Sequence, residues 1–320
     1  MKHIFVVNPK AGPSNSVPFI RQEIEKLSDR YDCEVYETKG AKDATDFVSR
    51  YLASNPGLPV RFYACGGDGT LNEVMSGALG HANASISCYP CGSGNDFVKY
   101  YGGASRFMDF EALIEGKERS IDVLTDGERY SINVANFGFD YVAAKKMIEI
   151  KNKLFFKGKR AYTYGIAYAL FNAMKSKAKV LVDGKPISEK DALLLCTVSN
   201  GSYVGGSYHC APRSDNEDGL LEICLAEPIS VFRLLKLIGC YKKGNHLDNP
   251  KFKSFLRYTR GKEVEVIAED DSFGYTMDGE PVTSKHFTFR ILPEAIRFAV
   301  PLSEEERKAA GQNAEQAVLS

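Results

Sequence analysis

The 320-residue sequence has no excess of either charge and no long run of apolar residues. Its 41 basic side chains are matched by 41 acidic ones, which argues against a general nucleic-acid-binding protein. No apolar stretch reaches the roughly 20 residues that a membrane-spanning helix needs. The apolar part of the N-terminus, residues 4–7, is too short for a signal peptide. We therefore expect a cytoplasmic protein that meets the inner face of the membrane only peripherally.

Several metal and nucleotide motifs are also missing. Cys88 and Cys91 have the spacing of half a zinc site, but no second pair of cysteines or histidines completes it. We interpret the eight cysteines as ordinary thiols. Neither the Gly-Lys-Ser/Thr ending of a Walker loop nor the Gly-x-Gly-x-x-Gly pattern of dinucleotide-binding folds occurs.

The first part of the chain alternates strand and helix patterns. Short apolar runs typical of strands are found at residues 4–7, 34–38, 60–64 and 85–89. Apolar residues recur at helical spacing in residues 17–27, 43–52 and 71–79. This alternation predicts an α/β domain with a parallel, helix-covered sheet over residues 1–120.

The pattern changes at about residue 121, where strands separated by Asp-Gly turns take over. The expected strands are 121–123, 130–136, 179–182, 192–199, 220–225, 263–268, 273–277, 287–292 and 296–300. Helical stretches interrupt them at 141–174 and 230–241. We predict a second domain over residues 121–300, mostly antiparallel and arranged as a β-sandwich. The charged tail, residues 301–320, is assigned to the first domain, with a helix expected to start at Ser303.

The strongest candidate site is the segment Gly66-Gly67-Asp68-Gly69-Thr70, between an expected strand and an expected helix. Glycines let the backbone approach a ligand closely, and a helix N-terminus favours an anion. The combination suits a polyphosphate. Asp68 cannot bind phosphate itself, so a cation or a positioned water would have to mediate. A strand–helix turn with Asp68 as a cap is the structural alternative.

Two more loops follow other expected strands. They are Asn8-Pro9-Lys10-Ala11-Gly12, after the first strand, and Gly92-Ser93-Gly94-Asn95-Asp96-Phe97, after the strand at 85–89. The carboxyl ends of parallel strands share one edge of the sheet, where ligands bind in such folds. We therefore expect the three loops to line one site, although a tight turn would use the same residues.

With these loops the sequence resembles the diacylglycerol kinase catalytic domain family. That family includes soluble bacterial diacylglycerol and lipid kinases and the related sphingosine and ceramide kinases. The resemblance covers about residues 1–301 and extends to Asn200-Gly201, the segment from Asp215 to Leu220, and Asp278-Gly279-Glu280-Pro281. It implies a Rossmann-like (phosphofructokinase-type) N-terminal domain and a β-sandwich. It also implies ATP-dependent phosphorylation of a lipid hydroxyl, with diacylglycerol as the leading acceptor and phosphatidic acid as the product.

The resemblance implies roles for individual residues. The nucleotide would be bound by Asn8, Lys10, Thr38, Gly66, Gly67, Asp68, Gly69, Thr70, Ser93 and Asn95. Asp68 and Asp96, with Asp218, would form a carboxylate–water–magnesium network. A Mg²⁺ ion in the second domain would take the Asp218 carboxylate and the backbone carbonyls of Asp215 and Leu220. Asp218-Gly219 is equally the sequence of a plain turn.

Asp278 or Glu280 would be the general base that accepts the proton of the lipid hydroxyl. The two residues alternate along the sequence, so in an extended chain both could point to one side. The alternative is a hairpin turn at Asp278-Gly279. The sequence leaves the choice of base open, with a slight preference for Glu280.

Two departures from the bacterial relatives bear on the substrate. Pro13 stands where those enzymes commonly have a basic residue, and Lys99 stands in place of an arginine. NAD kinase and a non-catalytic nucleotide- or lipid-binding regulator are the alternative functions. A homodimer is common among the bacterial relatives. Basic residues around Leu154, Phe155 and Phe156, from Lys145 to Arg160, suggest contact with an anionic membrane.

Overall fold

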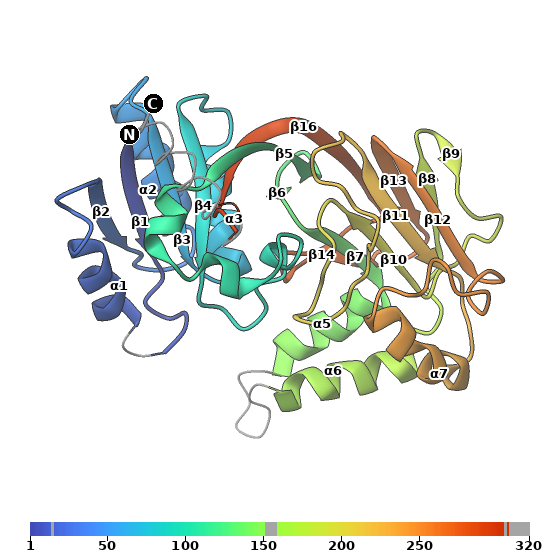
Figure 1. Ribbon diagram of the computed structural model, residues 1–320. Helices are drawn as coiled ribbons and strands as arrows, with labels where there is room; N and C mark the ends of the chain where they lie inside the picture. The colour runs from blue at the N-terminus through green and yellow to red at the C-terminus, as the bar shows by residue number, and fades with distance from the viewer. Residues whose placement is uncertain (14–15, 151–158, 304–305, 307–320) are drawn as a thin grey trace. The chain divides into compact units, whose positions relative to one another are not determined.

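The computed structural model describes residues 1–13, 16–150, 159–303 and 306 (Figure 1). The chain forms two compact units. The first is built from Met1–Ile121 and a C-terminal segment that begins at Glu294, and the second from Asp122–Pro293. The predicted boundary near residue 121 is close to this division. The predicted return at residue 301 differs from it, because the chain re-enters the first unit at Glu294.

The first unit contains a parallel sheet, as predicted. Its strands follow the order β2-β1-β3-β4, with bounds Asp32–Glu37, Lys2–Val7, Val60–Gly66 and Ala84–Pro90. All three pairings are parallel and in regular register. The helices between the strands are α1 (Ser16–Glu25), α2 (Asp43–Ser54) and α3 (Asp68–Ala78). The α/β class predicted for this unit is therefore confirmed.

Helices cover both faces of this sheet because adjacent strand residues point to opposite sides. Phe62 meets Tyr51 of α2 edge-on, with ring centroids 5.8 Å apart. The next residue, Tyr63, stacks on Phe5 at 4.2 Å on the other face. Phe5 in turn contacts Phe110 of the short helix α4 (Phe110–Ile114), at 5.8 Å. The core of the unit therefore lies on both sides of the sheet.

The prediction of two strands at 287–292 and 296–300 is wrong, because one strand, β16, runs from His286 to Val300. Its first part pairs antiparallel with β13 (Glu263–Ala268) in the second unit. Its last part pairs parallel with β4, with Arg297 opposite Ser85. Phe298 is fully buried and contacts the ring of Phe97 at 5.0 Å.

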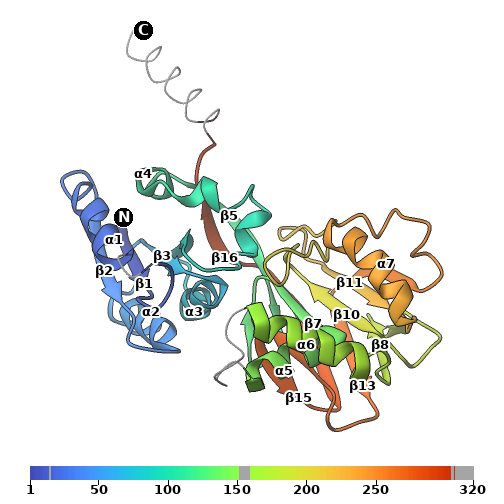
Figure 2. The same ribbon diagram turned by 90° about the horizontal axis from the view of Figure 1, so that it is seen from below.

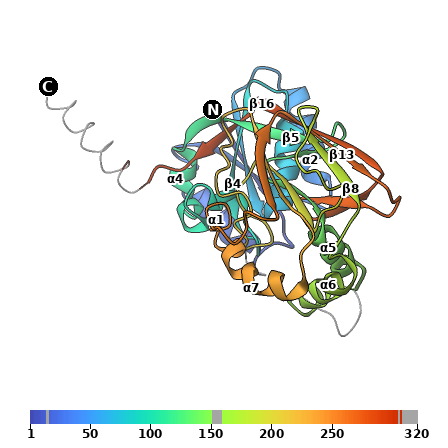
Figure 3. The ribbon, with the colours of Figure 1, turned by 90° about the vertical axis from the view of Figure 1, so that its right-hand side faces the viewer.

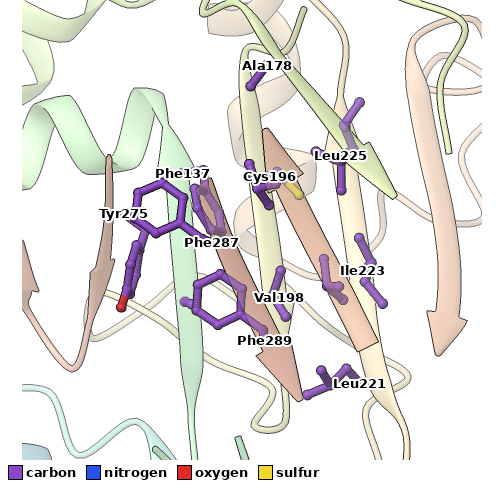
Figure 4. Close-up of a cluster of buried hydrophobic side chains, with 14 of the residues drawn as sticks. Phe137, Ala178, Cys196, Val198, Leu221, Ile223, Leu225, Tyr275, Phe287 and Phe289 are labelled. Carbon is purple, nitrogen blue, oxygen red and sulfur yellow. The ribbon is translucent and has the colours of Figure 1, made fainter. Parts of the chain in front are cut away.

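The second unit is a β-sandwich, as predicted. One sheet has the antiparallel order β12-β11-β10-β7-β14-β15, and these strands span Leu256–Gly261, Leu221–Ala226, Leu195–Ser199, Val134–Gly138, Gly274–Met277 and Glu280–Thr283. The facing strands are β13, β8 (Ala178–Val182), β9 (Lys185–Pro186) and the first part of β16. Phe137, Val198 and Ile223 of one sheet meet Phe287 and Phe289 of the other in a buried core (Figure 4). Strands β9, β12 and β15 were not predicted.

Strands β5 (Lys117–Thr125) and β6 (Tyr130–Ser131) form a short antiparallel pair near the predicted domain boundary. The long helix expected at 141–174 is two helices, α5 (Phe139–Ile150) and α6 (Lys159–Asn172). With α7 (Val231–Lys242) they pack into an apolar cluster outside the sandwich core, and Figures 2 and 3 show the three helices together on one side of this unit. Among the described helices, none is both long and apolar enough to cross a membrane.

The cap predicted for the tail is present at Ser303. Glu306 donates its backbone N–H to Ser303 Oγ at 3.1 Å, and Ser303 N donates to the Glu306 carboxylate at 2.7 Å. This reciprocal pair is a capping box. The rest of the tail lies outside the described residues.

Candidate active site

The loops after β1, β3 and β4 come together at the carboxyl edge of the parallel sheet, as the sequence predicted. Asn8 Nδ2 donates to Thr70 Oγ1 at 3.2 Å, which joins the first loop to the second. Cys91 N donates to the Gly66 carbonyl at 2.8 Å, which joins the second to the third. In the strand order β2-β1-β3-β4 this edge contains the switch point where α/β sheets bind ligands.

Two glycine contacts explain why these loops need residues without a side chain. A Cβ on Gly92 would lie 2.4 Å from the Cα of Gly67, closer than real Cβ contacts occur. Gly12 has a φ of +78°, and a Cβ there would lie 3.2 Å from Cβ of Cys91. The second and third loops can therefore meet backbone to backbone only with glycine at position 92, and the positive φ of Gly12 favours glycine in the first loop.

Asp68 ties the second loop to the third. It is the first residue of α3, so the helix begins three residues earlier than predicted. Its Oδ1 accepts hydrogen bonds from the backbone N–H groups of Asp96, at 2.7 Å, and Phe97, at 3.2 Å. Burial, and then the nearby charge of Asp96, raise the pKa of the Asp68 carboxyl above its ordinary value. Asp68 is thus a positioned carboxylate at the N-terminus of a helix, with a second oxygen close to Gly94.

The third loop holds its residues through local contacts. Asn95 adopts a left-handed backbone with φ +49°, and its Nδ2 donates to the Gly92 carbonyl at 2.8 Å. Lys99 Nζ lies 2.5 Å from Asp96 Oδ1. The lysine that replaces the family's arginine therefore pairs with the predicted magnesium-network residue Asp96 and offsets the negative charge that Asp96 brings beside Asp68.

The remaining predicted nucleotide residues lie along the same edge. Asn8 Oδ1 accepts from Lys10 N at 3.0 Å, and the Lys10 side chain is exposed. Thr38 is buried directly after β2, where its N–H donates to the Val7 carbonyl at 2.9 Å. Ser93 is exposed in the third loop, and Gly69 is exposed in the first turn of α3. The structure therefore brings all the predicted residues of the first unit to one edge, although their contacts with a nucleotide stay a prediction.

The predicted magnesium residues of the second unit form a compact loop. Asp218 Oδ1 accepts from Leu220 N at 3.0 Å, and Asp215 Oδ1 accepts from Glu217 N at 3.0 Å. The other oxygen of Asp218 is paired with Arg260, which also reaches Glu222 at 2.7 Å. Among the described residues, no three His, Cys, Asp or Glu side chains converge as metal ligands. The predicted site depends on one carboxylate and backbone carbonyls, which are hard oxygen donors suited to Mg²⁺.

Asp122 is a structural residue of this loop that the sequence analysis missed. It is fully buried on β5, and its Oδ2 accepts from Gly219 N at 2.7 Å. Its backbone N–H donates to the Asn216 carbonyl at 2.7 Å, and its carbonyl accepts from Asn200 Nδ2 at 2.8 Å. The sequence contained a sign of it, because an acid inside an apolar strand must find hydrogen-bond partners.

The hairpin alternative is realised at Asp278. Met277 of β14 pairs with Glu280 of β15, and the two residues between them have positive φ angles of +50° (Asp278) and +83° (Gly279). This is the geometry of a two-residue type I′ turn. The expectation that Asp278 and Glu280 alternate along an extended chain is therefore wrong, because the chain reverses between them. Glu280 is exposed and Asp278 is half-buried.

The cysteines are unbonded thiols. Cys91 lies against the first glycine loop, and burial raises the pKa of its thiol to about 11. A thiol with a raised pKa is a poor nucleophile at neutral pH, because little thiolate forms. This agrees with the interpretation of Cys88 and Cys91 as packing residues.

A parallel sheet with three glycine-rich loops at one edge, together with an antiparallel sandwich unit, has the features of a nucleotide-dependent kinase. The description "Diacylglycerol kinase catalytic domain" matches residues 2–125, and "YegS C-terminal NAD kinase beta sandwich-like domain" matches residues 133–300. The chain belongs to the YegS-like lipid kinases of the diacylglycerol kinase family.

Curated relatives agree with this placement. The chain is 31% identical over 302 residues to "Probable lipid kinase YegS-like" of Chromohalobacter salexigens, covering 91% of each chain. It is 24% identical over 301 residues to "Diacylglycerol kinase" of Bacillus subtilis, covering 90% of this chain and 95% of that one. The crystal structure of a diacylglycerol kinase from Bacillus anthracis shares the fold, with a TM-score of 0.68 at 20% identity over 95% of this chain and 98% of that one.

The protein is therefore an enzyme, a lipid kinase, and membership of a kinase family implies ATP as the phosphate donor. These matches favour lipid phosphorylation over the two alternatives considered from the sequence, NAD kinase and a non-catalytic regulator.

Proposed function

We propose that this lipid kinase transfers the γ-phosphate of ATP to the free hydroxyl of diacylglycerol and releases phosphatidic acid and ADP. The observation that carries the proposal is the meeting of three glycine loops around Asp68, whose Oδ1 is fixed by two backbone N–H groups. Such a site positions a polyphosphate rather than performing covalent chemistry, as phosphoryl transfer requires.

In the proposed step, the lipid oxygen forms a bond to the γ-phosphorus while the bond between that phosphorus and the β–γ bridging oxygen breaks. The hydroxyl proton passes to a carboxylate, and ADP leaves with the bond electrons. Glu280 is the better candidate base, because its side chain is exposed to an incoming substrate whereas Asp278 is held in the turn. The first-unit loops would bind and orient the phosphates through backbone N–H groups.

Mg²⁺ is part of the proposal. When bound, the ion would offset negative charge on the phosphates. Asp218, with the carbonyls of Asp215 and Leu220, offers oxygen donors for one ion, and Asp68 and Asp96 would contribute to a carboxylate–water network. Arg260 now pairs with one oxygen of Asp218, so the carboxylate has one charged partner in place already.

Activity on a panel of lipid alcohols tests the proposal. The panel contains short-chain diacylglycerol, monoacylglycerol, sphingosine and ceramide in detergent, with labelled ATP and mass detection of the product. We expect phosphatidic acid as the main product, and Glu280→Gln to lower turnover by at least roughly a hundredfold. Asp271→Asn is the matched control, because Asp271 is an exposed acid on the same unit, with a side chain 85% accessible.

Other outcomes redirect or refute the assignment. Preferential phosphorylation of another alcohol would replace diacylglycerol as the substrate and keep the kinase. ADP release without any lipid product would contradict lipid phosphorylation by this site. A larger loss in Asp278→Asn than in Glu280→Gln would make Asp278 the base.

A further inference from the structure

Helices α6 and α7 carry the most exposed large apolar side chains of the described residues. Phe171 of α6 is 88% exposed, and Phe232 and Leu235 of α7 are 80% and 56% exposed. Tyr164 and Tyr168, on α6, are also exposed. We refer to Phe171, Phe232 and Leu235 as the apolar face. Burying a side chain of this size is favourable by about 1.5–3 kcal/mol, so a group of them left in water on neighbouring helices marks an interaction surface.

The packing of the two helices explains why these residues face outward. On α7, Leu234, Leu237 and Tyr241 recur at helical spacing and are buried. Phe232 and Leu235 lie on the opposite side of the same helix. On α6 the buried positions include the small residues Ala161 and Ala169, whereas Tyr164, Tyr168 and Phe171 are exposed. Both helices contribute to one apolar cluster, which places them in the same layer (Figures 1 and 3).

The two helices that carry the apolar face contain basic side chains and no acidic one. No acidic residue occurs between Glu149 and Asp183 or between Glu227 and Asp248, the stretches that contain the two helices. In contrast, the whole chain has equal numbers of acids and bases. The exposed bases of these stretches include Arg160, Lys175, Lys236, Lys242 and Lys243. Within the part of the chain that the structure describes, Lys236 and Lys243 have no ion-pair partner, so their charge faces the solvent.

We propose that the solvent-facing sides of α6 and α7 form a docking surface for an anionic lipid bilayer. The proposal rests on the proposed function, since a kinase that phosphorylates a membrane lipid has to reach its substrate at the bilayer surface. Phe171, Phe232 and Leu235 would enter the acyl boundary, as aromatic and aliphatic residues of interfacial helices do. Each base near the surface adds about 1 kcal/mol of attraction to anionic headgroups.

This surface differs from the one the sequence suggested. Of the segment from Lys145 to Arg160, residues 151–158 lie outside the described residues. Lys145 and Lys146 are engaged within the fold: Lys145 donates to Tyr141 at 3.1 Å, and Lys146 pairs with Glu149 at 2.9 Å. The apolar face is instead on the two helices that follow, and the bilayer, rather than a second copy of the chain, is the occupant that their uniform positive charge favours.

Flotation with phospholipid vesicles tests the surface without using turnover. The full chain is mixed with vesicles of phosphatidylcholine alone or with vesicles in which about one third of the lipid is phosphatidylglycerol. The triple variant Phe171→Ser, Phe232→Ser, Leu235→Ser removes the apolar face, and Lys236→Glu with Lys243→Glu reverses its charge. The matched control is Leu58→Ser with Ile267→Ser, two exposed apolar residues elsewhere that are 41% and 42% accessible.

We expect the wild type and the control to float with anionic vesicles, and both test variants to lose at least roughly tenfold in affinity. Activity on detergent-dispersed short-chain diacylglycerol should stay within about twofold of wild type, which separates this proposal from the function itself. Unchanged vesicle binding by the triple variant would overturn the proposal. So would a wild type that ignores vesicles and forms a dimer that the triple variant dissociates, measured by light scattering.

Discussion

Replacing Asp68 by Ala or by Asn separates its contribution to the stability of the fold from its contribution to the reaction. In the wild type its Oδ1 accepts from Asp96 N at 2.7 Å and from Phe97 N at 3.2 Å. Alanine removes the acceptor and leaves both N–H groups without it. Asparagine keeps a carbonyl oxygen in the same place and removes only the charge. The two variants should therefore unfold differently and be equally inactive.

The expected magnitudes follow from these contacts. A hydrogen bond to a charged group contributes about 1.5–3 kcal/mol to stability. The pKa of Asp68 is raised by burial, so the ionised form is itself unfavourable in the fold. Each of the two hydrogen bonds should therefore contribute near the lower end of that range. We expect Asp68→Ala to cost about 2–4 kcal/mol of unfolding free energy. With a urea dependence of about 3 kcal/mol per molar, the midpoint falls by about 0.7–1.3 M.

Asp68→Asn should be close to wild type in stability, and its advantage should grow with pH. A carboxyl with a raised pKa stabilises the fold while it is neutral at low pH, and that stability is lost as pH rises through the folded pKa. The amide does not ionise, so it avoids this loss. Both variants should lose turnover by at least roughly a hundredfold.

Urea unfolding followed by tyrosine fluorescence, and mass detection of the phosphorylated lipid, check the two halves separately. An unchanged urea midpoint in Asp68→Ala would refute the role of Asp68 as the tie between the loops. Normal turnover in a folded Asp68→Asn protein would refute its role in the reaction.

Three further predictions concern other residues. Gly92→Ala places a Cβ 2.4 Å from the Cα of Gly67 and should weaken ATP binding by at least roughly tenfold. Calorimetry measures the affinity, and a wild-type value would contradict the close contact between the loops. Burial raises the pKa of Asp140 to about 6, so Asp140→Asn should unfold like wild type below pH 4 and be more stable by up to about 3 kcal/mol above pH 6; no pH-dependent gain would rule this out. Asp218→Asn should lower the melting temperature more in Mg²⁺ than in chelator, because the Arg260 pair is lost in both conditions and only the ion differs.

The glycine loops were predictable because their chemistry is local. Gly12 has a positive φ, which glycine adopts more readily than other residues, and Gly92 makes a close backbone contact that leaves no room for a Cβ. Strand–helix alternation in the first unit and Asp-Gly turns in the second also follow from short-range patterns. The sequence therefore predicted two units of the correct class, and it predicted that the three loops of the first unit share one edge of the sheet.

Long-range partners were not predictable in this way. The pairing of Asp218 with Arg260 and the capture of Gly219 N by Asp122 join residues far apart in the chain. Local chemistry is also ambiguous at Asp278: the turn at Asp183-Gly184 has the same positive φ angles, +47° and +77°, in a hairpin with no predicted function. A turn sequence therefore cannot show by itself which turn presents a reactive carboxylate.

The break predicted within β16 has a specific cause. Pro293 lacks an N–H and usually ends a strand, and Glu294 takes a left-handed backbone with φ +49°. The strand nevertheless continues through this irregularity from His286 to Val300. Such a local distortion is tolerated because the residues on either side have pairing partners in β13 and β4.

The course of β16 has a consequence for how the protein is made. The ribosome completes the whole second unit before it adds residues 294–300, which finish the sheet of the first. Until then β4 lacks the hydrogen bond from Ser87 Oγ to the Ala299 carbonyl, and Phe97 lacks Phe298. During synthesis β4 therefore has an unpaired edge, and such an edge favours aggregation or chaperone binding. A fragment ending at residue 121 would remain in that unfinished state.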